Sequence, residues 1–236
     1  MQSFDSAQDR GKLSMVATPI GNLEDITLRA LRILKEADAI YCEDTRVTTK
    51  LLAHYDIHVP LKRLDANIET TKATEVIDRL TKGQRIAYVT DAGTPGISDP
   101  GYRLVAAVRD ALADTCTIET IPGPSALAAA LSIVGLKADE FVFLGFLPHK
   151  KGRQTLIKEI AQSSRAYVLY ESSHRIMKLL DELEAAAPER TIAVARELTK
   201  KFENVQLGTP GHIRQYFAEQ FPGKVPGEFV VIVEAQ

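Results

Sequence analysis

The sequence contains no tryptophan, and aromatic residues make up only 6% of its 236 residues. A binding surface built mainly from stacked aromatic rings is therefore disfavoured. The two cysteines, Cys42 and Cys116, lie far apart in apolar runs, and neither has a second cysteine or a histidine at metal-ligand spacing. This pattern disfavours a disulfide framework and a zinc site, predicts no metal, and indicates two buried thiols.

Long apolar runs and an excess of one charge are also missing. The longest apolar-biased stretch, residues 125–136, is too short to span a bilayer, and the polar segment 1–12 does not resemble a signal peptide. The formal net charge of −2 argues against a protein that coats nucleic acid non-specifically. We expect a soluble, cytoplasmic protein in which any nucleic-acid contact comes from a local basic patch.

Several common nucleotide and hydrolase motifs are absent from the sequence. It contains no G-x-G-x-x-G after the first apolar run and no G-x-x-x-x-G-K-[ST] loop. It also lacks H-E-x-x-H and G-x-S-x-G. These absences disfavour four classes of function: dinucleotide binding of the usual kind, nucleotide hydrolysis, zinc proteolysis and serine esterase chemistry.

The sequence does contain a regular alternation of apolar strand-like runs and amphipathic helical stretches, which predicts an α/β fold with partly parallel sheets. The Pro-Gly-Pro run at residues 122–124 interrupts this pattern, which then restarts. We expect a disordered tail at 1–11 and two α/β domains, 12–121 and 122–236, each with a sheet of about five strands. Asp25 is the expected cap of the first helix.

Four expected strand ends are followed by unusual loops, at residues 18–22, 43–46, 91–101 and 121–126. Ligands bind beyond the carboxyl ends of strands in open α/β sheets, so these loops predict a site. The loop 91–101 contains three glycines and two prolines. Glycine allows close approach of the backbone to a ligand and proline restricts the loop, so the loop favours a binding role over a simple connection.

Together the loops resemble the tetrapyrrole methylase superfamily and, within it, the ribosomal RNA small-subunit methyltransferase I family. The matching segments, in chain order, are ATPIGNLEDITLRAL, CEDTR, VTDAGTPGISDPG, IPGPSA, LGFLPHKKGR, YESSHR and ARELTK. The resemblance covers essentially the whole chain after residue 12. It implies a homodimer of two-domain α/β subunits with a cofactor cleft between the domains. It also implies transfer of a methyl group from S-adenosylmethionine to the ribose 2′-hydroxyl of a cytidine in 16S ribosomal RNA.

The same resemblance assigns cofactor-binding residues one by one. They are Pro19, Gly93, Thr94, Pro95, Ser98, Asp99, Ser125, Ala126, Tyr170, Glu171, Ser172, Leu198, Thr199 and Gly227. Thr94 stands where many members of the superfamily have aspartate, so its contact is left open. Ser125 and Ala126 lie at an expected helix N-terminus, whose free N–H groups suit the cofactor's carboxylate.

A ribose hydroxyl is a weak acid, so a general base or a cation near the oxygen should help its methylation. The carboxylates at expected strand ends are Glu43, Asp44, Asp91 and Asp99, and we favour Asp44 as the base, with Arg46 as its orienting partner or a phosphate contact. The alternative is that residues 43–46 cap the next helix and form a local salt bridge.

The densest basic cluster is expected to contact RNA phosphates, although a run of charges is usually a solvated surface. The candidate RNA-binding residues are His149, Lys150, Lys151, Arg153, Arg175, Lys200 and Lys201. Two other functions stay open at this point. One is a tetrapyrrole C-methyltransferase of the precorrin type, and the other is a non-catalytic RNA-binding module.

Overall fold

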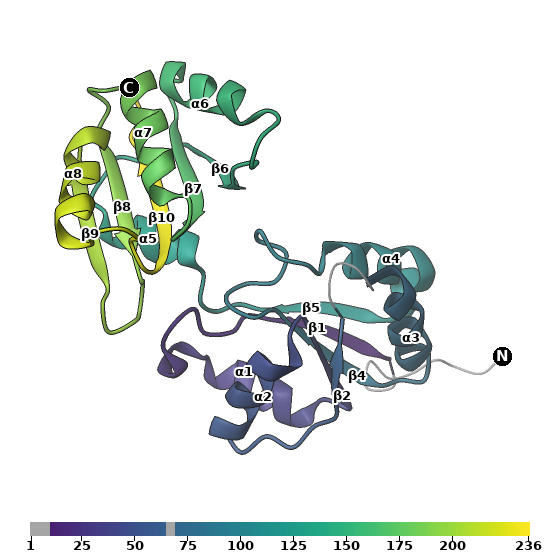
Figure 1. Ribbon diagram of the computed structural model, residues 1–236. Helices are drawn as coiled ribbons and strands as arrows, with labels where there is room; N and C mark the ends of the chain where they lie inside the picture. The colour runs from purple at the N-terminus through teal and green to yellow at the C-terminus, as the bar shows by residue number, and fades with distance from the viewer. Residues whose placement is uncertain (1–9, 65–68) are drawn as a thin grey trace. The chain divides into compact units, whose positions relative to one another are not determined.

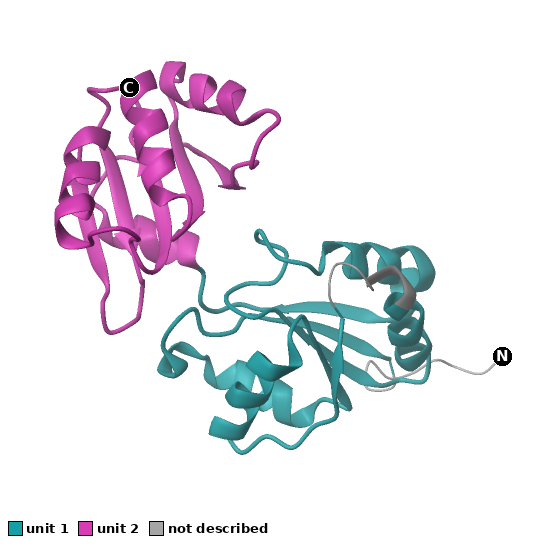
Figure 2. Ribbon diagram, viewed as in Figure 1, with its two compact units in different colours: residues 1–125 teal, residues 126–236 magenta. Residues whose placement is uncertain are grey.

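The computed structural model describes residues 10–64 and 69–236, and the chain divides into two compact units (Figures 1 and 2). Unit 1 comprises residues 1–125 and unit 2 comprises residues 126–236. Each unit contains one five-stranded sheet covered by helices, which confirms the predicted α/β fold class and the two sheets of about five strands.

The sheet of unit 1 is entirely parallel, with strand order β3-β2-β4-β1-β5. Its strands are β1 (Lys12–Val16), β2 (Ala39–Cys42), β3 (Leu61–Arg63), β4 (Arg85–Val89) and β5 (Thr117–Ile121). Its helices are η1 (Leu23–Asp25), α1 (Leu28–Glu36), α2 (Thr45–His54), α3 (Glu69–Thr81), α4 (Tyr102–Leu112) and η2 (Ala113–Thr115). Because the strands are parallel, their carboxyl ends meet at one edge of the sheet.

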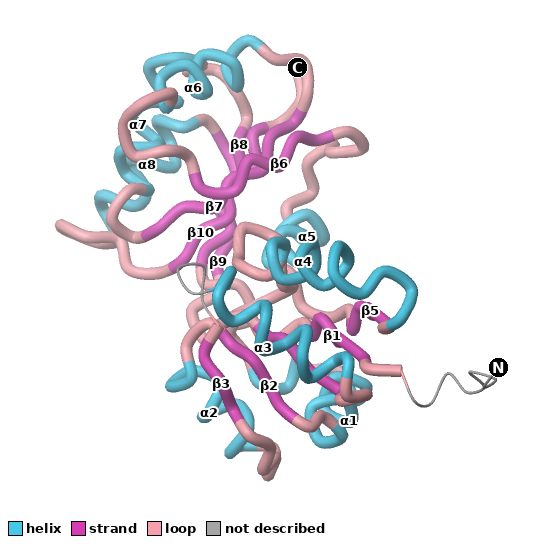
Figure 3. Tube along the Cα trace, turned by 90° about the vertical axis from the view of Figure 1, so that its right-hand side faces the viewer, coloured by secondary structure: helices cyan, strands magenta, loops and turns pink. Residues whose placement is uncertain are grey.

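Both faces of this sheet are buried, as expected for a parallel sheet. Helices α3 and α4 cover one face of the sheet, and α1 and α2 cover the other (Figure 3). Tyr41 and Tyr88 belong to the core beneath α3 and α4, whereas their neighbours Ile40 and Ala87 belong to the core beneath α1 and α2. The alternation follows from the two-residue period of a strand, so β2 and β4 each contribute to two separate hydrophobic cores.

The first helix begins later than the sequence suggested. The hydroxyl of Thr27 accepts a hydrogen bond from the backbone N–H of Ala30 at 3.1 Å and caps α1. Asp25, the expected cap, instead belongs to the short 3-10 helix η1, which Asn22 caps. The prediction that Asp25 caps the helix was therefore wrong. Two short elements begin here in succession, and Asn22 caps the first and Thr27 the second.

The sheet of unit 2 is mixed, with strand order β6-β7-β10-β8-β9 and one parallel pair, β6 with β7. Its strands are β6 (Phe141–Phe146), β7 (Ala166–Ser172), β8 (Ile192–Arg196), β9 (Asn204–Gly208) and β10 (Glu228–Val233). Its helices are α5 (Ala126–Ile133), α6 (Arg153–Gln162), α7 (Ile176–Ala186) and α8 (Pro210–Gln220). Helices α6, α7 and α8 bury one hydrophobic core against the sheet, with Leu179 and Phe217 fully enclosed (Figure 1).

Residues 1–9 of the expected disordered tail lie outside the described residues. Gly11, also in that segment, is buried, and its carbonyl accepts a hydrogen bond from the N–H of Thr117 at 2.9 Å. A Cβ on Gly11 would lie 2.0 Å from the carbonyl oxygen of Leu80, so the chain already packs against unit 1 before β1 begins. In the two described ranges, no helix has the length and apolar character needed to cross a membrane.

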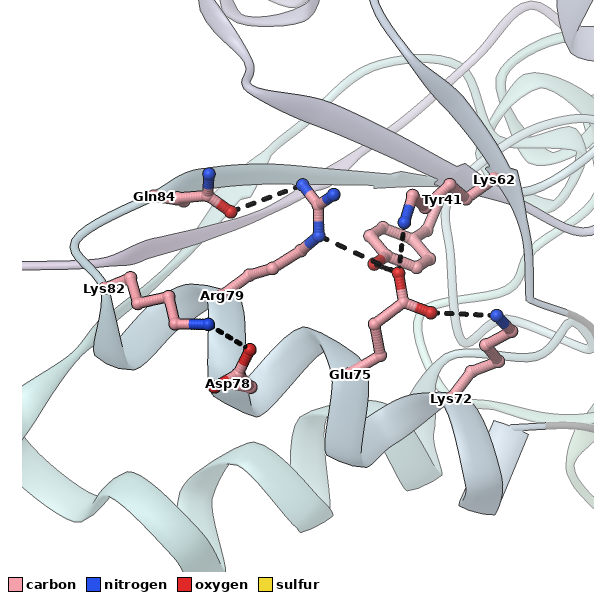
Figure 4. A network of polar contacts seen from close by, with 8 residues as sticks. All are labelled: Tyr41, Lys62, Lys72, Glu75, Asp78, Arg79, Lys82 and Gln84. Carbon is pink, nitrogen blue, oxygen red and sulfur yellow. Dashed lines mark hydrogen bonds and ion pairs between the residues drawn. The ribbon is translucent and has the colours of Figure 1, made fainter.

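A polar network centred on Glu75 joins α3 to strands β2 and β3 (Figure 4). The hydroxyl of Tyr41 donates to Oε1 of Glu75 at 2.8 Å, and Lys72 donates to Oε2 at 2.8 Å. Lys62 and Arg79 also pair with this carboxylate. Hydrogen bonds from the two lysines lower the pKa of Glu75 to about 2, and burial raises the pKa of Tyr41. One ionised carboxylate therefore holds an edge strand, a central strand and a helix together.

We expect Glu75→Gln to lower the free energy of unfolding by about 1 kcal/mol at pH 7, a modest value because the carboxylate is partly exposed to solvent. The contribution of Glu75 is present above its ordinary pKa of 4.5 and is lost as pH falls toward 2, so the difference from wild type shrinks below pH 4. Urea unfolding at pH 7 and pH 3 measures both effects. Asp78→Asn, on the same helix but paired with Lys82 on the surface, is the matched control, and an equal loss in both variants would contradict the prediction.

Candidate functional site

The loops that follow β1 and β4 are joined by backbone hydrogen bonds at the carboxyl edge of unit 1. The N–H of Thr18 donates to the carbonyl of Gly93, and the N–H of Gly93 donates back to the carbonyl of Thr18, both at 3.0 Å. The hydroxyl of Thr18 also donates to the carbonyl of Thr90 at 3.2 Å. The segment containing Pro19 is thus fixed against the start of the loop 91–101.

The loop after β5 joins the same assembly through Thr94. Its hydroxyl donates to the carbonyl of Pro124 at 3.0 Å, which gives this threonine a structural contact of its own. Gly93 has a φ of +81°, and a Cβ there would lie 3.4 Å from Ile20 and 3.8 Å from the carbonyl of Pro124. The structure therefore brings together Pro19, Gly93, Thr94 and the residues leading to Ser125, which the sequence predicted as cofactor contacts.

Asp44 and Arg46 are engaged with each other at the start of α2. Asp44 is the N-cap of α2, and its Oδ1 accepts from the N–H of Arg46 at 2.8 Å and from Nε of Arg46 at 3.0 Å. These hydrogen bonds lower the pKa of Asp44 to about 2. A carboxylate with such a low pKa is a weak proton acceptor, so the geometry favours the alternative of a helix cap with a local salt bridge over a general base.

Asp99 has the opposite electrostatic character. It lies in the loop 91–101 directly after Ser98, which adopts a φ of +60°. Burial, together with the negative charges of Glu43 and Asp91, raises the pKa of Asp99 to about 7. Asp91 accepts the backbone N–H of Asp44 at 3.0 Å, so its carboxylate ties two loops together. The pKa of Asp99 therefore suits a proton acceptor near neutral pH, whereas that of Asp44 does not.

The mixed sheet of unit 2 brings its own predicted residues to one edge. Antiparallel pairing places Glu228, at the start of β10, opposite Ser172 at the end of β7, and Phe229 opposite Arg196 at the end of β8. Gly227, Ser172 and the turn containing Leu198 and Thr199 are therefore neighbours, although 55 positions separate Ser172 from Gly227 in the chain.

The turn after β8 is strained, with φ values of +54° at Glu197 and +64° at Thr199. Leu198 between them is buried. The N–H of Thr199 donates to the carboxylate of Glu203, whereas its buried Oγ1 has no hydrogen-bond partner among the residues that the structure describes. Strained backbone and an unpaired buried hydroxyl are features of ligand sites, so this turn fits a binding role.

Tyr170 and Glu171 make protein contacts that the sequence did not indicate. The hydroxyl of Tyr170 accepts the backbone N–H of Leu127 at 3.1 Å, at the N-terminus of α5 beside Ala126. One of the N–H groups expected to bind a carboxylate is therefore already paired. The carboxylate of Glu171 is buried and pairs with Arg175 at 2.7 Å, so its side chain faces into unit 2 and does not support a direct cofactor contact.

The predicted RNA-binding residues divide into exposed and engaged groups. Exposed side chains are those of His149, Lys150, Lys151 and Lys201. Arg153, in contrast, is buried with only 2% of its surface exposed and pairs with Glu171 and Glu182, so its position does not support contact with RNA. Arg175 pairs with Glu171, and Lys200 pairs with Glu197 and Glu228 at 2.8 Å each, so their charges are already matched within unit 2.

With this geometry in place, comparison with known proteins identifies the family. The model of the Tetrapyrrole (Corrin/Porphyrin) Methylases matches residues 12–213. The chain belongs to the tetrapyrrole methylase family. Among curated relatives, the ribosomal RNA small subunit methyltransferase I of Halalkalibacterium halodurans is 43% identical over 99% of this chain and 79% of the relative. The protein of the same name from Escherichia coli O157:H7 is 43% identical over 99% of this chain and 80% of that protein. The chain is thus also a member of the ribosomal RNA small subunit methyltransferase I family.

Two solved structures share the fold of this chain. A cobalt precorrin-4 methyltransferase superposes with a TM-score of 0.70 at 16% identity and covers 98% of both chains. A diphthine synthase also superposes with a TM-score of 0.70, at 15% identity, over 94% of this chain and 90% of its own. At this level of identity the likeness concerns the fold alone, and it confirms the predicted α/β fold class.

Two features of this tetrapyrrole methylase were missed in the sequence. Thr18 was grouped with a turn cluster, yet its backbone pairs with Gly93 and joins two loops. Asp99 was assigned to cofactor binding and named among four candidate carboxylates, and its raised pKa depends on burial, on Glu43, which is distant in sequence, and on Asp91 in the same loop. The only sequence signal for either was its place after a strand, a property that Asp44 shares.

Proposed function

We propose that the protein transfers a methyl group from S-adenosylmethionine to the ribose 2′-hydroxyl of a cytidine in 16S ribosomal RNA. The observation that carries the proposal is the 43% identity over 99% of the chain to a ribosomal RNA small subunit methyltransferase I. A precorrin-type C-methyltransferase is less well supported, because the likeness to such an enzyme is 16% in sequence and concerns the fold. We also propose a cytoplasmic homodimer.

The residues at the two sheet edges fit S-adenosylmethionine. Gly93 leaves free a space that a Cβ would enter beside Ile20, and Thr199 provides an unpaired buried hydroxyl within the described structure. We propose that the cofactor is held by Pro19, Gly93, Thr94, Pro95, Ser98, Ser125, Ala126, Tyr170, Ser172, Leu198, Thr199 and Gly227. When bound, S-adenosylmethionine supplies a methyl group on a positively charged sulfur.

The chain's own contribution to the chemistry is orientation and removal of one proton. Fixed loops that align the ribose oxygen with the methyl group lower the barrier by up to about 7–11 kcal/mol. We propose that Asp99, in place of Asp44, accepts the proton of the ribose 2′-hydroxyl as its oxygen bonds to the methyl carbon. Its pKa of about 7 leaves it largely ionised at slightly alkaline pH and still basic enough to take that proton.

We propose that the exposed residues His149, Lys150 and Lys151 contact RNA phosphates, with Lys201 as a further candidate. Lys151→Glu is expected to weaken RNA binding about tenfold, to reduce the salt dependence of binding and to leave cofactor affinity unchanged. Fluorescence anisotropy with a labelled RNA fragment at several salt concentrations measures this. Lys137→Glu, an exposed position paired only with Asp139 among the described residues, is the charge-matched control. Equal losses in both variants would mean that net charge, not this loop, determines affinity.

The proposed function is tested by transfer of labelled methyl from S-adenosylmethionine to small ribosomal subunits that lack ribose methylation. Naked 16S RNA and a uroporphyrinogen serve as parallel acceptors. Label at a nuclease-resistant ribose of the subunit or the RNA is the expected result. Label on the tetrapyrrole would show that the acceptor is a tetrapyrrole and not RNA. If the cofactor binds but no acceptor is labelled, a non-catalytic RNA-binding module is favoured.

A further inference from the structure

Unit 2 contains a buried cluster of four charged residues, the arginine–glutamate cluster, formed by Arg153, Glu171, Arg175 and Glu182. The side chains of Glu171 and Arg153 are 0% and 2% exposed, and those of Glu182 and Arg175 are 11% and 15% exposed. Burying so many charges is unfavourable unless they are paired, and apolar residues of similar size often stabilise a fold as well. Stability alone is therefore a weak explanation for this cluster of buried charges.

Glu171 is the centre of the cluster. Its Oε1 accepts from the N–H of Ser172 at 2.7 Å and forms an ion pair with Nε of Arg175 at 2.7 Å, and its Oε2 lies 3.7 Å from Nη1 of Arg153. Arg153 donates through Nε to Oε2 of Glu182 at 2.7 Å. One carboxylate on β7 thus holds a guanidinium from α6 and another from the turn before α7.

Both guanidiniums also hold the backbone of the loop between β6 and α6. Nη1 of Arg175 donates to the carbonyl of Leu147 at 2.8 Å, and Nη1 of Arg153 donates to the carbonyl of Pro148 at 3.4 Å. These two carbonyls immediately precede the exposed His149, Lys150 and Lys151. The guanidinium of Arg175 also lies 5.8 Å from the ring centroid of Phe146, the last residue of β6.

We propose that Glu171 is a positioning residue for the RNA substrate, which fixes the basic loop 149–152 through Arg153 and Arg175. This inference rests on the proposed function. Two lysines on a free loop lose conformational entropy when they bind a phosphate backbone, whereas a loop fixed at its stem has already lost much of it. Glu171, which the resemblance assigned to the cofactor, thereby restricts the motion of the loop 149–152. Arg153 and Arg175 transmit this restraint through their hydrogen bonds to the backbone before the loop.

The test is Glu171→Gln, which keeps the shape of the side chain and removes its charge. Three quantities are measured: the rate of trypsin cleavage after Lys150 and Lys151, the KM for RNA with kcat, and the Kd for S-adenosylmethionine. We expect cleavage and KM for RNA to rise by about tenfold, equivalent to about 1.4 kcal/mol, while kcat and the cofactor Kd stay within about twofold. A weaker cofactor Kd with unchanged cleavage would overturn the proposal and return Glu171 to the cofactor site.

Further variants keep the test decisive if Glu171→Gln does not fold. Arg175→Lys retains the charge but loses the Nη1 donor to the carbonyl of Leu147, and it is expected to raise cleavage and KM for RNA by a smaller factor. Lys178→Gln, an exposed position on α7 next to the cluster, is the control and should change neither. If Arg175→Lys behaves like Lys178→Gln, the proposal fails. If wild type methylates no RNA while cleavage of Glu171→Gln still rises, the RNA role is overturned and only the anchoring of the loop stands.

Discussion

Asp99→Asn is expected to reduce kcat for methyl transfer by about 10²–10⁴-fold, the usual effect of losing a general base. In wild type, kcat should rise with pH and level off above the pKa of Asp99, about 7, because only the ionised carboxylate accepts the proton. The variant should lose this rise and still bind S-adenosylmethionine. Single-turnover methyl transfer between pH 5.5 and 9 measures both the rate and its pH dependence.

Two other substitutions test whether the effect on the pH profile is specific to Asp99. Asp110→Asn changes an exposed aspartate on α4 and should leave the pH profile as in wild type. Asp44→Asn keeps a good N-cap residue on α2 and removes only the exposed ion pair with Arg46, so it should change stability little and leave the pH dependence in place. If Asp44→Asn, and not Asp99→Asn, abolished the rise with pH, the base would be Asp44, as the sequence first suggested.

Asp99→Asn should also stabilise the protein at alkaline pH. The folded state raises the pKa of Asp99 from 3.8 to about 7, so the stabilisation from this group is present below pH 3.8 and is lost as pH rises through 7. Asparagine stays neutral, so the variant should gain about 1–2 kcal/mol above pH 7, after allowance for partial exposure, and nothing below pH 4. Thermal unfolding at pH 4 and pH 8 checks the sign.

Gly93→Ala is expected to weaken S-adenosylmethionine binding by at least about 100-fold. Its φ of +81° is unfavourable for alanine, and the new Cβ would lie 3.4 Å from Ile20 in the space assigned to the cofactor. It would also strain the two hydrogen bonds with Thr18, so some loss of stability should accompany the loss of binding. Isothermal titration with S-adenosylmethionine measures the affinity.

Gly96→Ala separates strain from occupied space. Gly96 lies in the same loop with a φ of +86°, yet no described atom lies within 4 Å of the position its Cβ would take. Both variants impose a similar backbone penalty, of order 1 kcal/mol. A much larger loss of affinity for Gly93→Ala supports its place at the cofactor, and equal losses would mean that loop strain alone explains the result.

The fold was largely predictable because local patterns determine it. Short continuous apolar runs at β2 and β4 predict strands, and the Pro-Gly-Pro run at 122–124 lies in the loop where the two units meet in sequence. The position of Thr27 as the cap was harder to predict, because Asn22, Asp25 and Thr27 are all good caps within six residues. Sequence alone does not rank such competing caps, since the outcome depends on which backbone turn packs against the sheet.

The site was predictable as a set of loops and less so as a set of roles. Parallel strands bring their ends together, so Pro19, Gly93 and Ser125 could be grouped from order alone. The state of Arg153 could not be predicted, because an arginine in a basic run is usually solvated, and its burial depends on Glu171 and Glu182 from other elements. The raised pKa of Asp99 likewise depends on burial and on Glu43, which only folding supplies, whereas the low pKa of Asp44 comes mainly from Arg46 two positions away.

The paired hydrogen bonds between Thr18 and Gly93 make a loop region behave like part of the sheet. Their two amide protons are each bonded to a carbonyl of the other loop. In hydrogen–deuterium exchange these amides should therefore exchange slowly, at rates closer to those of β1 and β4 than to those of a surface loop. The edge that is proposed to receive the cofactor would then be formed in advance, so that little free energy of binding is used to order it.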